Sequence, residues 1–143
     1  MDLRTVATLH LATTWFLIGL IWFVQVAHYP LFAQVGRDRF VAYERAYTPR
    51  VTRVVLPAML LEVLLAAWLG WLAPPELRGW ALLGLLALAV VWASTFLLQV
   101  PCHRVLAERP DPDTMQRLVR SNWLRTAAWT GRGAIALLVV LRT

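Results

Sequence analysis

The chain has 143 residues, 59% of them hydrophobic, and its 14 basic side chains give it a formal net charge of +6. So apolar a chain is not an ordinary soluble domain, because too few polar residues remain to cover a folded surface. Its single cysteine, Cys102, excludes an intrachain disulfide and a zinc site built on cysteines.

Four apolar stretches are each long enough to cross a hydrocarbon core, which takes about 20 helical residues. They cover about residues 6–29, 54–73, 80–100 and 123–141. We expect Pro30 to end the first, because proline disfavours helix at the preceding residue, and Pro74-Pro75 to end the second. Four such stretches leave too little polar chain to wrap them. The sequence therefore predicts a single domain over residues 1–143, an all-α, up-down four-helix transmembrane bundle.

Two longer connections, residues 30–53 and 101–122, are expected at one face of this bundle. In the second, Asp111-Pro112-Asp113 predicts a helix start, with an acidic cap and proline in the first turn. We expect that helix to continue into the fourth span.

The arginines are distributed unequally between the two faces. Ten of the 14 lie at the face of the two longer connections, and three lie at the face of the termini. By the positive-inside rule, the connections are cytoplasmic and both termini face outward. The sequence predicts an integral protein of the bacterial inner (plasma) membrane, with the lipid bilayer as a partner and no nucleic acid.

Glu62 interrupts the second span, within LPAMLLEVLLAAWLGWL (residues 56–72). A carboxylate at the bilayer centre costs about 2.5–3.5 kcal/mol on insertion scales. Glu62 lies 11 residues before Ala73 and Arg132 lies 10 residues before Arg142, so at ~1.5 Å per residue both are about 15 Å deep. The matching depths predict an intramembrane Glu62–Arg132 ion pair. This pair is either structural or part of the chemistry, with Glu62 as a deep base or proton acceptor.

Further polar residues gather where the spans meet the cytoplasmic face. The spans contribute Gln25, His28, Thr95, Gln99, His103, Ser121, Asn122 and Arg125. The first connection can cover this layer with Tyr43, Glu44, Tyr47 and Arg50. We expect a polar funnel from the cytoplasm down to Glu62, with a substrate pocket formed by Gln25, Tyr43, Tyr47 and Gln99.

Two histidines and a carboxylate in this layer form a candidate cofactor site. His28, Glu44 and His103 are the residue types of a facial triad for a non-haem metal, and His28 and His103 could instead ligate a haem. Alternatively, both histidines only favour the helix dipole and the headgroup region, and no cofactor is bound. His10, with Thr14 four residues later, is expected to be structural.

The second half of the chain resembles a known family. The motifs are Gln99-Val-Pro101-Cys-His103 and, some twenty residues later, Asn122-Trp123-Leu-Arg125-Thr126. Over residues 95–130 they resemble the anthrone-oxygenase-like family of small four-span membrane proteins. The resemblance implies oxidation of a polycyclic phenolic or similarly lipophilic substrate, in one form without a cofactor.

Three functions follow from these observations. The first is a membrane oxidoreductase or oxygenase for a lipophilic substrate (phenolic, quinone-like or lipid), in a pocket open to the cytoplasm. In it, His28 and His103 are ligands or acid–base groups, while Asn122 and Arg125 orient an anionic or phenolic oxygen. The second is a carrier or channel for a small solute or proton, working as a homo-oligomer. The third is a non-catalytic subunit of a larger membrane complex.

Overall fold

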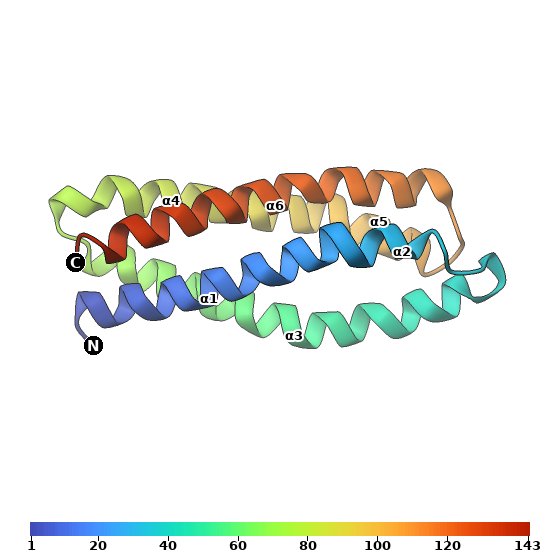
Figure 1. The fold of residues 1–143 in the computed structure, drawn as a ribbon, viewed down its shortest axis with the longest axis horizontal. Helices are drawn as coiled ribbons and strands as arrows, with labels where there is room; N and C mark the ends of the chain where they lie inside the picture. Colours follow the sequence, from blue (N-terminus) through green and yellow to red (C-terminus); the bar gives the residue numbers. More distant parts are fainter.

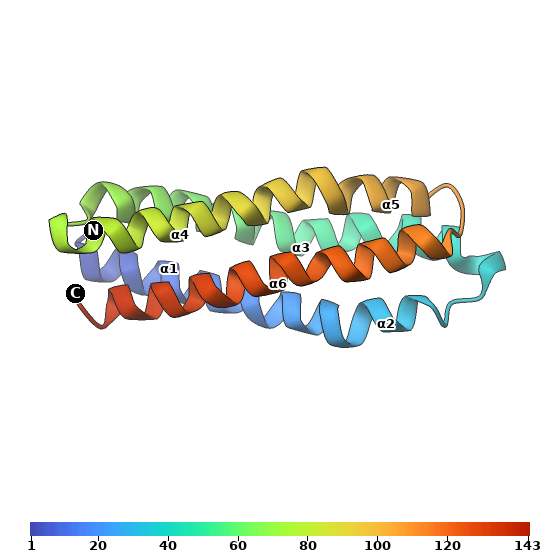
Figure 2. The same ribbon diagram turned by 90° about the horizontal axis from the view of Figure 1, so that it is seen from above.

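The computed structural model describes all 143 residues, and it is helical almost throughout, without strands. The elements are α1 (Leu3–Phe23), η1 (Val24–His28), α2 (Tyr29–Phe32), α3 (Arg37–Leu72), α4 (Pro75–Ser94), η2 (Thr95–Gln99), α5 (Val100–Leu106) and α6 (Pro112–Val140). Because α1–η1–α2 and α4–η2–α5 are each continuous, the chain forms four long helices. These lie side by side along one axis, and both termini lie at the same end (Figures 1 and 2).

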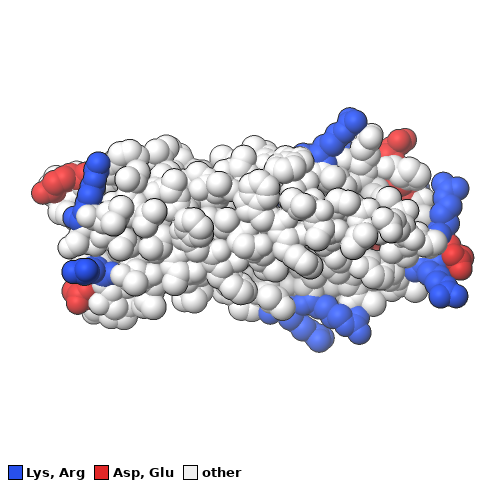
Figure 3. Space-filling view, in the orientation of Figure 1, with Lys and Arg blue, Asp and Glu red and all other residues white.

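Three of the long helices are long and apolar enough to cross a membrane: Leu3–Phe32, Arg37–Leu72 and Pro75–Leu106. Helix α6 does not join them, because Arg125 and Arg132 lie within its apolar part. Charged side chains gather toward the two ends of the molecule and leave a belt without charged side chains between them (Figure 3). The prediction of a membrane protein is thereby supported, and the crossing by α6 stays a prediction.

Pro30 does not end the first helix as predicted, and Pro101 likewise lies inside a continuous helix. Each proline stands two residues after a five-residue π-helical turn, η1 or η2. In η1 the Tyr29 N–H donates to the Val24 carbonyl, five residues back, and an equivalent bond closes η2. A proline clashes with the carbonyl four residues back and donates no hydrogen bond. The wider turn accommodates it and lets the helix continue.

Much of the predicted connections 30–53 and 101–122 is helical, and only short non-helical segments link the long helices. Helix α3 already begins at Arg37, and non-helical chain separates α5 from α6 only over residues 107–111. The predicted helix start at Asp111 is confirmed, and this helix continues to Val140. The Thr114 hydroxyl donates to the Asp111 carboxylate at 2.7 Å, which lowers the pKa of that carboxyl.

The interior contains three apolar clusters, one at each end and one in the middle. Leu69, Leu77 and Val139 belong to the cluster at the end with the termini. Met59 and Val91 belong to the middle cluster. Of the 37 buried residues, however, eleven are polar or charged. Such a share needs an explanation in a protein that is expected to lie in lipid, and these eleven residues define the candidate sites.

Candidate functional site

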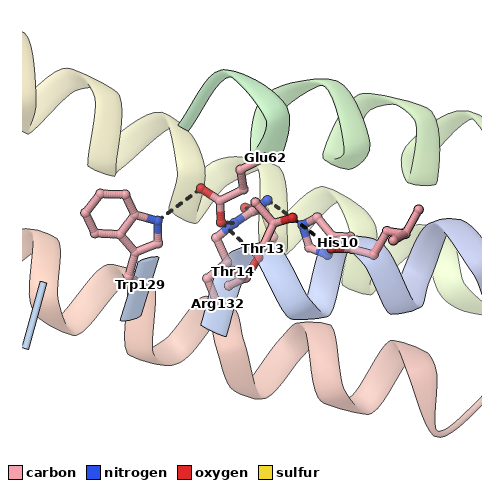
Figure 4. A network of polar contacts seen from close by, with 8 residues as sticks. His10, Thr13, Thr14, Glu62, Trp129 and Arg132 are labelled. Atoms are coloured by element: carbon pink, nitrogen blue, oxygen red, sulfur yellow. Dashed lines mark hydrogen bonds and ion pairs between the residues drawn. The ribbon is translucent and has the colours of Figure 1, made fainter. Parts of the chain in front are cut away.

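The first site is a network of buried polar side chains, here called the deep network: His10, Thr14, Glu62, Trp129 and Arg132 (Figure 4). Arg132 Nε donates to Glu62 Oε1 at 2.8 Å, and Thr14 donates to the same oxygen at 2.9 Å. Trp129 Nε1 donates to Glu62 Oε2 at 3.0 Å. The structure therefore joins the two charges that matching depth had paired, and it hydrogen-bonds both carboxylate oxygens.

The other nitrogens of Arg132 are also occupied. Nη1 donates to the Gly84 carbonyl, and Nη2 donates to His10 Nε2 at 2.7 Å. Because an arginine cannot accept a hydrogen bond, Nε2 of His10 is the acceptor, and the ring N–H of His10 is at Nδ1. A Cβ added at Gly84 would lie 3.4 Å from Arg132 Nη1, an ordinary van der Waals contact.

These contacts argue against the predicted chemical role of Glu62. Its side chain is fully buried, both its oxygens have partners, and it does not line the cavity described below. The cavity includes Trp129, which bonds Glu62, but not Glu62 itself, so the predicted funnel stops one side chain short of the carboxylate. His10 and Thr14, which the sequence analysis left as isolated structural residues, are partners of the ion pair.

The second site lies toward the other end of the molecule and is built on Glu44 of α3 and His103 of α5. His103 Nδ1 lies 2.6 Å from Glu44 Oε1, and the Glu44 side chain is fully buried. The Thr48 hydroxyl donates to the same oxygen at 2.8 Å, whereas Oε2 has no partner. We call Glu44 and His103 the dyad.

The partners of His103 assign its tautomer. A carboxylate only accepts hydrogen bonds, so Nδ1 carries a proton and donates it to Glu44. Nε2 is then an acceptor, and the Tyr29 hydroxyl lies 3.3 Å from it. A carboxylate that accepts from Nδ1 in this way fixes the tautomer and the orientation of the ring and leaves Nε2 free to accept.

Gln25, Asn122 and Arg125 form a third group beside the dyad. Asn122 Nδ2 donates to Gln25 Oε1 at 2.8 Å, and Gln25 Nε2 donates to the Val119 carbonyl at 3.3 Å. Arg125 Nη1 donates to Asn122 Oδ1 at 3.3 Å, and its guanidinium lies 5.2 Å from the ring centroid of Trp129. Trp129 thus contacts both this group and the deep network.

A cavity of about 590 Å³ separates these polar groups from a largely apolar wall. Its polar lining includes Tyr29, Glu44, Gln99, His103 and Arg125. Its apolar lining comes from α1, α3 and α4 and includes Leu17, Ile21, Val55, Met59 and Trp92. A volume of this size lies within the range of about 300–1,000 Å³ that is common for small-molecule pockets.

The cavity opens sideways between α3 and the η2–α5 segment. Its exposed lining residues come from these two elements: Thr52 and Leu56 on one side, Phe96 and Arg104 on the other. Leu56 and Phe96 are exposed apolar side chains. The opening is therefore bordered by apolar as well as polar side chains.

The structure assembles the predicted pocket only in part. Tyr47 and Gln99 line the cavity, whereas Gln25 and Tyr43 do not. Gln25 is buried against Asn122, and Asn122 does not line the cavity either. Glu44 and His103, which were predicted as metal ligands, do line it.

The predicted metal triad is not assembled. No group of three His, Cys, Asp or Glu side chains is arranged to hold a metal ion. His28 instead stacks on Tyr47, with ring centroids 4.3 Å apart, and packs edge-on against Phe32. Tyr47 also lies 6.2 Å from the ring of His103, so a haem held between the two histidines would have to displace Tyr47.

The chain resembles no protein in the comparisons. No protein-family model, curated protein or solved structure matches it. The function is therefore inferred from the chemistry of the residues that line the cavity.

Proposed function

We propose that the chain is an integral membrane oxidoreductase of the oxygenase type, which takes a lipophilic phenolic substrate into the cavity and oxidises it. It would cross the bacterial inner membrane four times, with both termini outside, as an up-down four-helix bundle. The resemblance to the anthrone-oxygenase-like family favours the same substrate class, and a dimer or trimer is compatible with this arrangement.

Crossing by α6 is supported by the burial of its arginines. Arg125 and Arg132 are 8% and 1% exposed, so neither charge faces lipid. Arginines inside membrane spans are tolerated where they face other helices or a cavity. The cytoplasmic assignment of the α2–α3 and α5–α6 end is supported by the excess of arginines there.

The observation that carries the proposal is the dyad in the wall of an apolar cavity. His103 Nε2 can accept a proton from a phenol or from an acidic C–H of the substrate, directly or through the Tyr29 hydroxyl. Glu44 holds the imidazole and stabilises its charged form. The resulting carbanion or phenolate is the electron-rich species that O2 oxidises.

For an activated methylene group, one molecule of oxygen converts the methylene carbon to a ketone and releases one molecule of water. Two C–H bonds break, one oxygen atom enters the product, and the other leaves as water with the two hydrogens. Molecular oxygen is the oxidant, and the role of this chain's residues is to bind and deprotonate the substrate.

The test is oxygen consumption by the purified protein in lipid nanodiscs, with anthrone as the probe and anthraquinone formation followed by absorbance. We expect His103→Asn and Glu44→Gln to lower the rate about 10²–10⁴-fold, the usual contribution of a general base. Glu108→Gln is the matched control, because Glu108 is exposed beyond α5 and should leave the rate unchanged. A wild-type protein that does not accelerate the reaction, or a fully active His103→Asn variant, would refute the proposal.

The carrier alternative has less support. It needs a polar route past the deep network to the end with the termini, and the void beside His10, Gly84 and Arg132 is only about 10 Å³. That is about the space of a single water molecule.

A further inference from the structure

We propose that Arg125 makes the cavity a site for an anion, so that the ligand is held as its conjugate base with the anionic oxygen on the guanidinium. The ligand class is an apolar, polycyclic body that carries one acidic phenol or enol. Its identity as a phenol rests on the proposed function, whereas the anion site follows from the charges of the cavity alone.

Arg125 is a buried cation without a counterion. No carboxylate lies within 4.0 Å of its guanidinium, since the ion pairs of the structure involve only Arg39, His103 and Arg132. Of its five N–H donors, one has a hydrogen bond, to Asn122 at 3.3 Å, and Nε is buried without a partner.

The energetics of a buried cation favour an anionic ligand. An unpaired charge in a low-dielectric interior is unfavourable, and a cation–π contact such as that with Trp129 offsets only part of this cost. Arg132 is the contrasting case, because every nitrogen of its guanidinium has a hydrogen-bond partner within the protein. Arg125 differs in that it lines a cavity large enough for a ligand to supply the missing anion.

Proton transfer within the cavity would pair all of its charges. With a neutral His103, the empty cavity contains a negative Glu44 and a positive Arg125 that are not in contact. When a bound phenol transfers its proton to His103, the imidazolium pairs with Glu44 and the phenolate pairs with Arg125. One separated pair of charges thus becomes two contact pairs, and in a low-dielectric site this exchange favours the ionised ligand.

The lining of the cavity also explains how an amphiphilic acid would be oriented. The lining combines a few polar side chains with apolar ones, most of which come from α1, α3 and α4. Arg45 and Arg104 are exposed at the rim, and Arg45 Nε is anchored on the Ala107 carbonyl at 2.8 Å. An acidic lipophile entering from the membrane would pass these cations before its oxygen reaches Arg125.

The test measures the ionisation of a bound probe. A hydroxyanthraquinone absorbs at longer wavelength as a phenolate, so its apparent pKa can be titrated in nanodiscs with and without the protein. We expect the wild-type protein to lower the pKa of the dye by at least about one unit, a tenfold shift of the equilibrium. Arg125→Gln should abolish this shift, and Arg125→Lys, which keeps the charge, should retain part of it.

The matched control is Arg120→Gln, which removes an exposed charge from the same helix. We expect it to leave the shift unchanged, which separates a cavity effect from attraction to the basic surface. The methyl ether of the dye, which cannot ionise, should bind the wild-type protein at least about tenfold more weakly than the phenol. An unshifted dye, or equal binding of phenol and ether, overturns the inference even if Arg125→Gln fails to fold.

The two proposals fail separately. A dye that is bound as its phenolate by a protein that does not oxidise anthrone would refute the oxygenase and leave the anion site in place. Oxidation of anthrone by a protein that leaves the dye unshifted would support the oxygenase and refute the anion site.

Discussion

The two buried charged regions of this protein differ in how completely their groups are paired. In the deep network, Glu62 and Arg132 satisfy one another, and Thr14, Trp129, Gly84 and His10 occupy the remaining positions. Among the side chains of the deep network only His10 Nδ1 has no partner, whereas around the cavity Glu44 Oε2, Gln99 Oε1 and Arg125 Nε all have none. The second region lines a cavity of about 590 Å³, whereas the deep network meets that cavity only at Trp129 and otherwise adjoins a void of about 10 Å³.

The difference indicates a division of roles. A fully hydrogen-bonded ion pair between α3 and α6 holds the helices in one register and offers no free atom to a ligand. A region with unpaired donors and acceptors is costly unless something binds there. We therefore assign structure to the deep network and ligand binding to the cavity, and the following variants test this contrast.

The largest effect is expected for Arg132→Met. It leaves the Glu62 carboxylate buried with hydrogen bonds but no countercharge, which should lower the free energy of unfolding by about 3–5 kcal/mol. Unfolding of the purified protein in detergent measures this. The double variant Glu62→Gln/Arg132→Met removes both charges and should recover most of the loss. A single variant as stable as wild type would contradict the structural role.

A smaller effect is expected for Trp129→Phe. The substitution removes the hydrogen bond from Nε1 to Glu62 Oε2 and keeps an aromatic ring beside Arg125. A hydrogen bond to a charged group contributes about 1.5–3 kcal/mol, and the unfolding free energy should fall by that amount. Trp71→Phe is the control, because Trp71 is 87% exposed. Equal stability of the two variants would show that the indole bond is not formed.

Thr14→Val should have a milder effect, about 1–2 kcal/mol, because Glu62 Oε1 keeps its bond to Arg132. Thr13→Val is a matched control in the adjacent position, since its hydroxyl donates only to the Leu9 carbonyl of its own helix. The difference between the two melting curves measures the contribution of Thr14 to the network. If the two variants melt at the same temperature, the hydroxyl of Thr14 does not contribute to the deep network.

The smallest effect on stability is expected for Arg125→Met in the ligand-free protein. Removing a buried charge that has no counterion should change the unfolding free energy by less than about 1 kcal/mol, or increase it. Unfolding of the purified protein in detergent measures this change. Arg132→Met, which should lower the unfolding free energy, is the contrasting variant. A loss as large as that of Arg132→Met would mean that Arg125 is paired within the protein and that the cavity needs no anion.

Much of the helical architecture could be predicted from the sequence. Long apolar stretches and the start at Asp111 located the helices, and equal distances from the span ends paired Glu62 with Arg132. The same measure applied to the first helix would have found Thr14, which lies 11 residues after Leu3 and so at the depth of Glu62. His10 carried no comparable indication, because its partner Arg132 reaches it through the end of a long side chain.

The π-helical turns are the feature that the local sequence pattern predicted least well. Pro30 predicted a helix end because proline disfavours helix at the preceding residue, yet α3 also continues through Pro49 and Pro57. At Pro30 and Pro101 a single π-helical turn removes the clash with the preceding turn. As a result α2 and α5 extend the long helices, and α5 brings His103 to Glu44.

The sequence by itself determined the helical class, the long apolar stretches, the excess of arginine at one end and the matching positions of Glu62 and Arg132 along their helices. These properties depend on residue type and on distance along a helix, which are local. Only the tertiary structure decided which charges are paired and where the cavity opens. Both depend on the rotation of each helix about its axis and on the separation of α3 from α5, which arise from packing across the whole molecule.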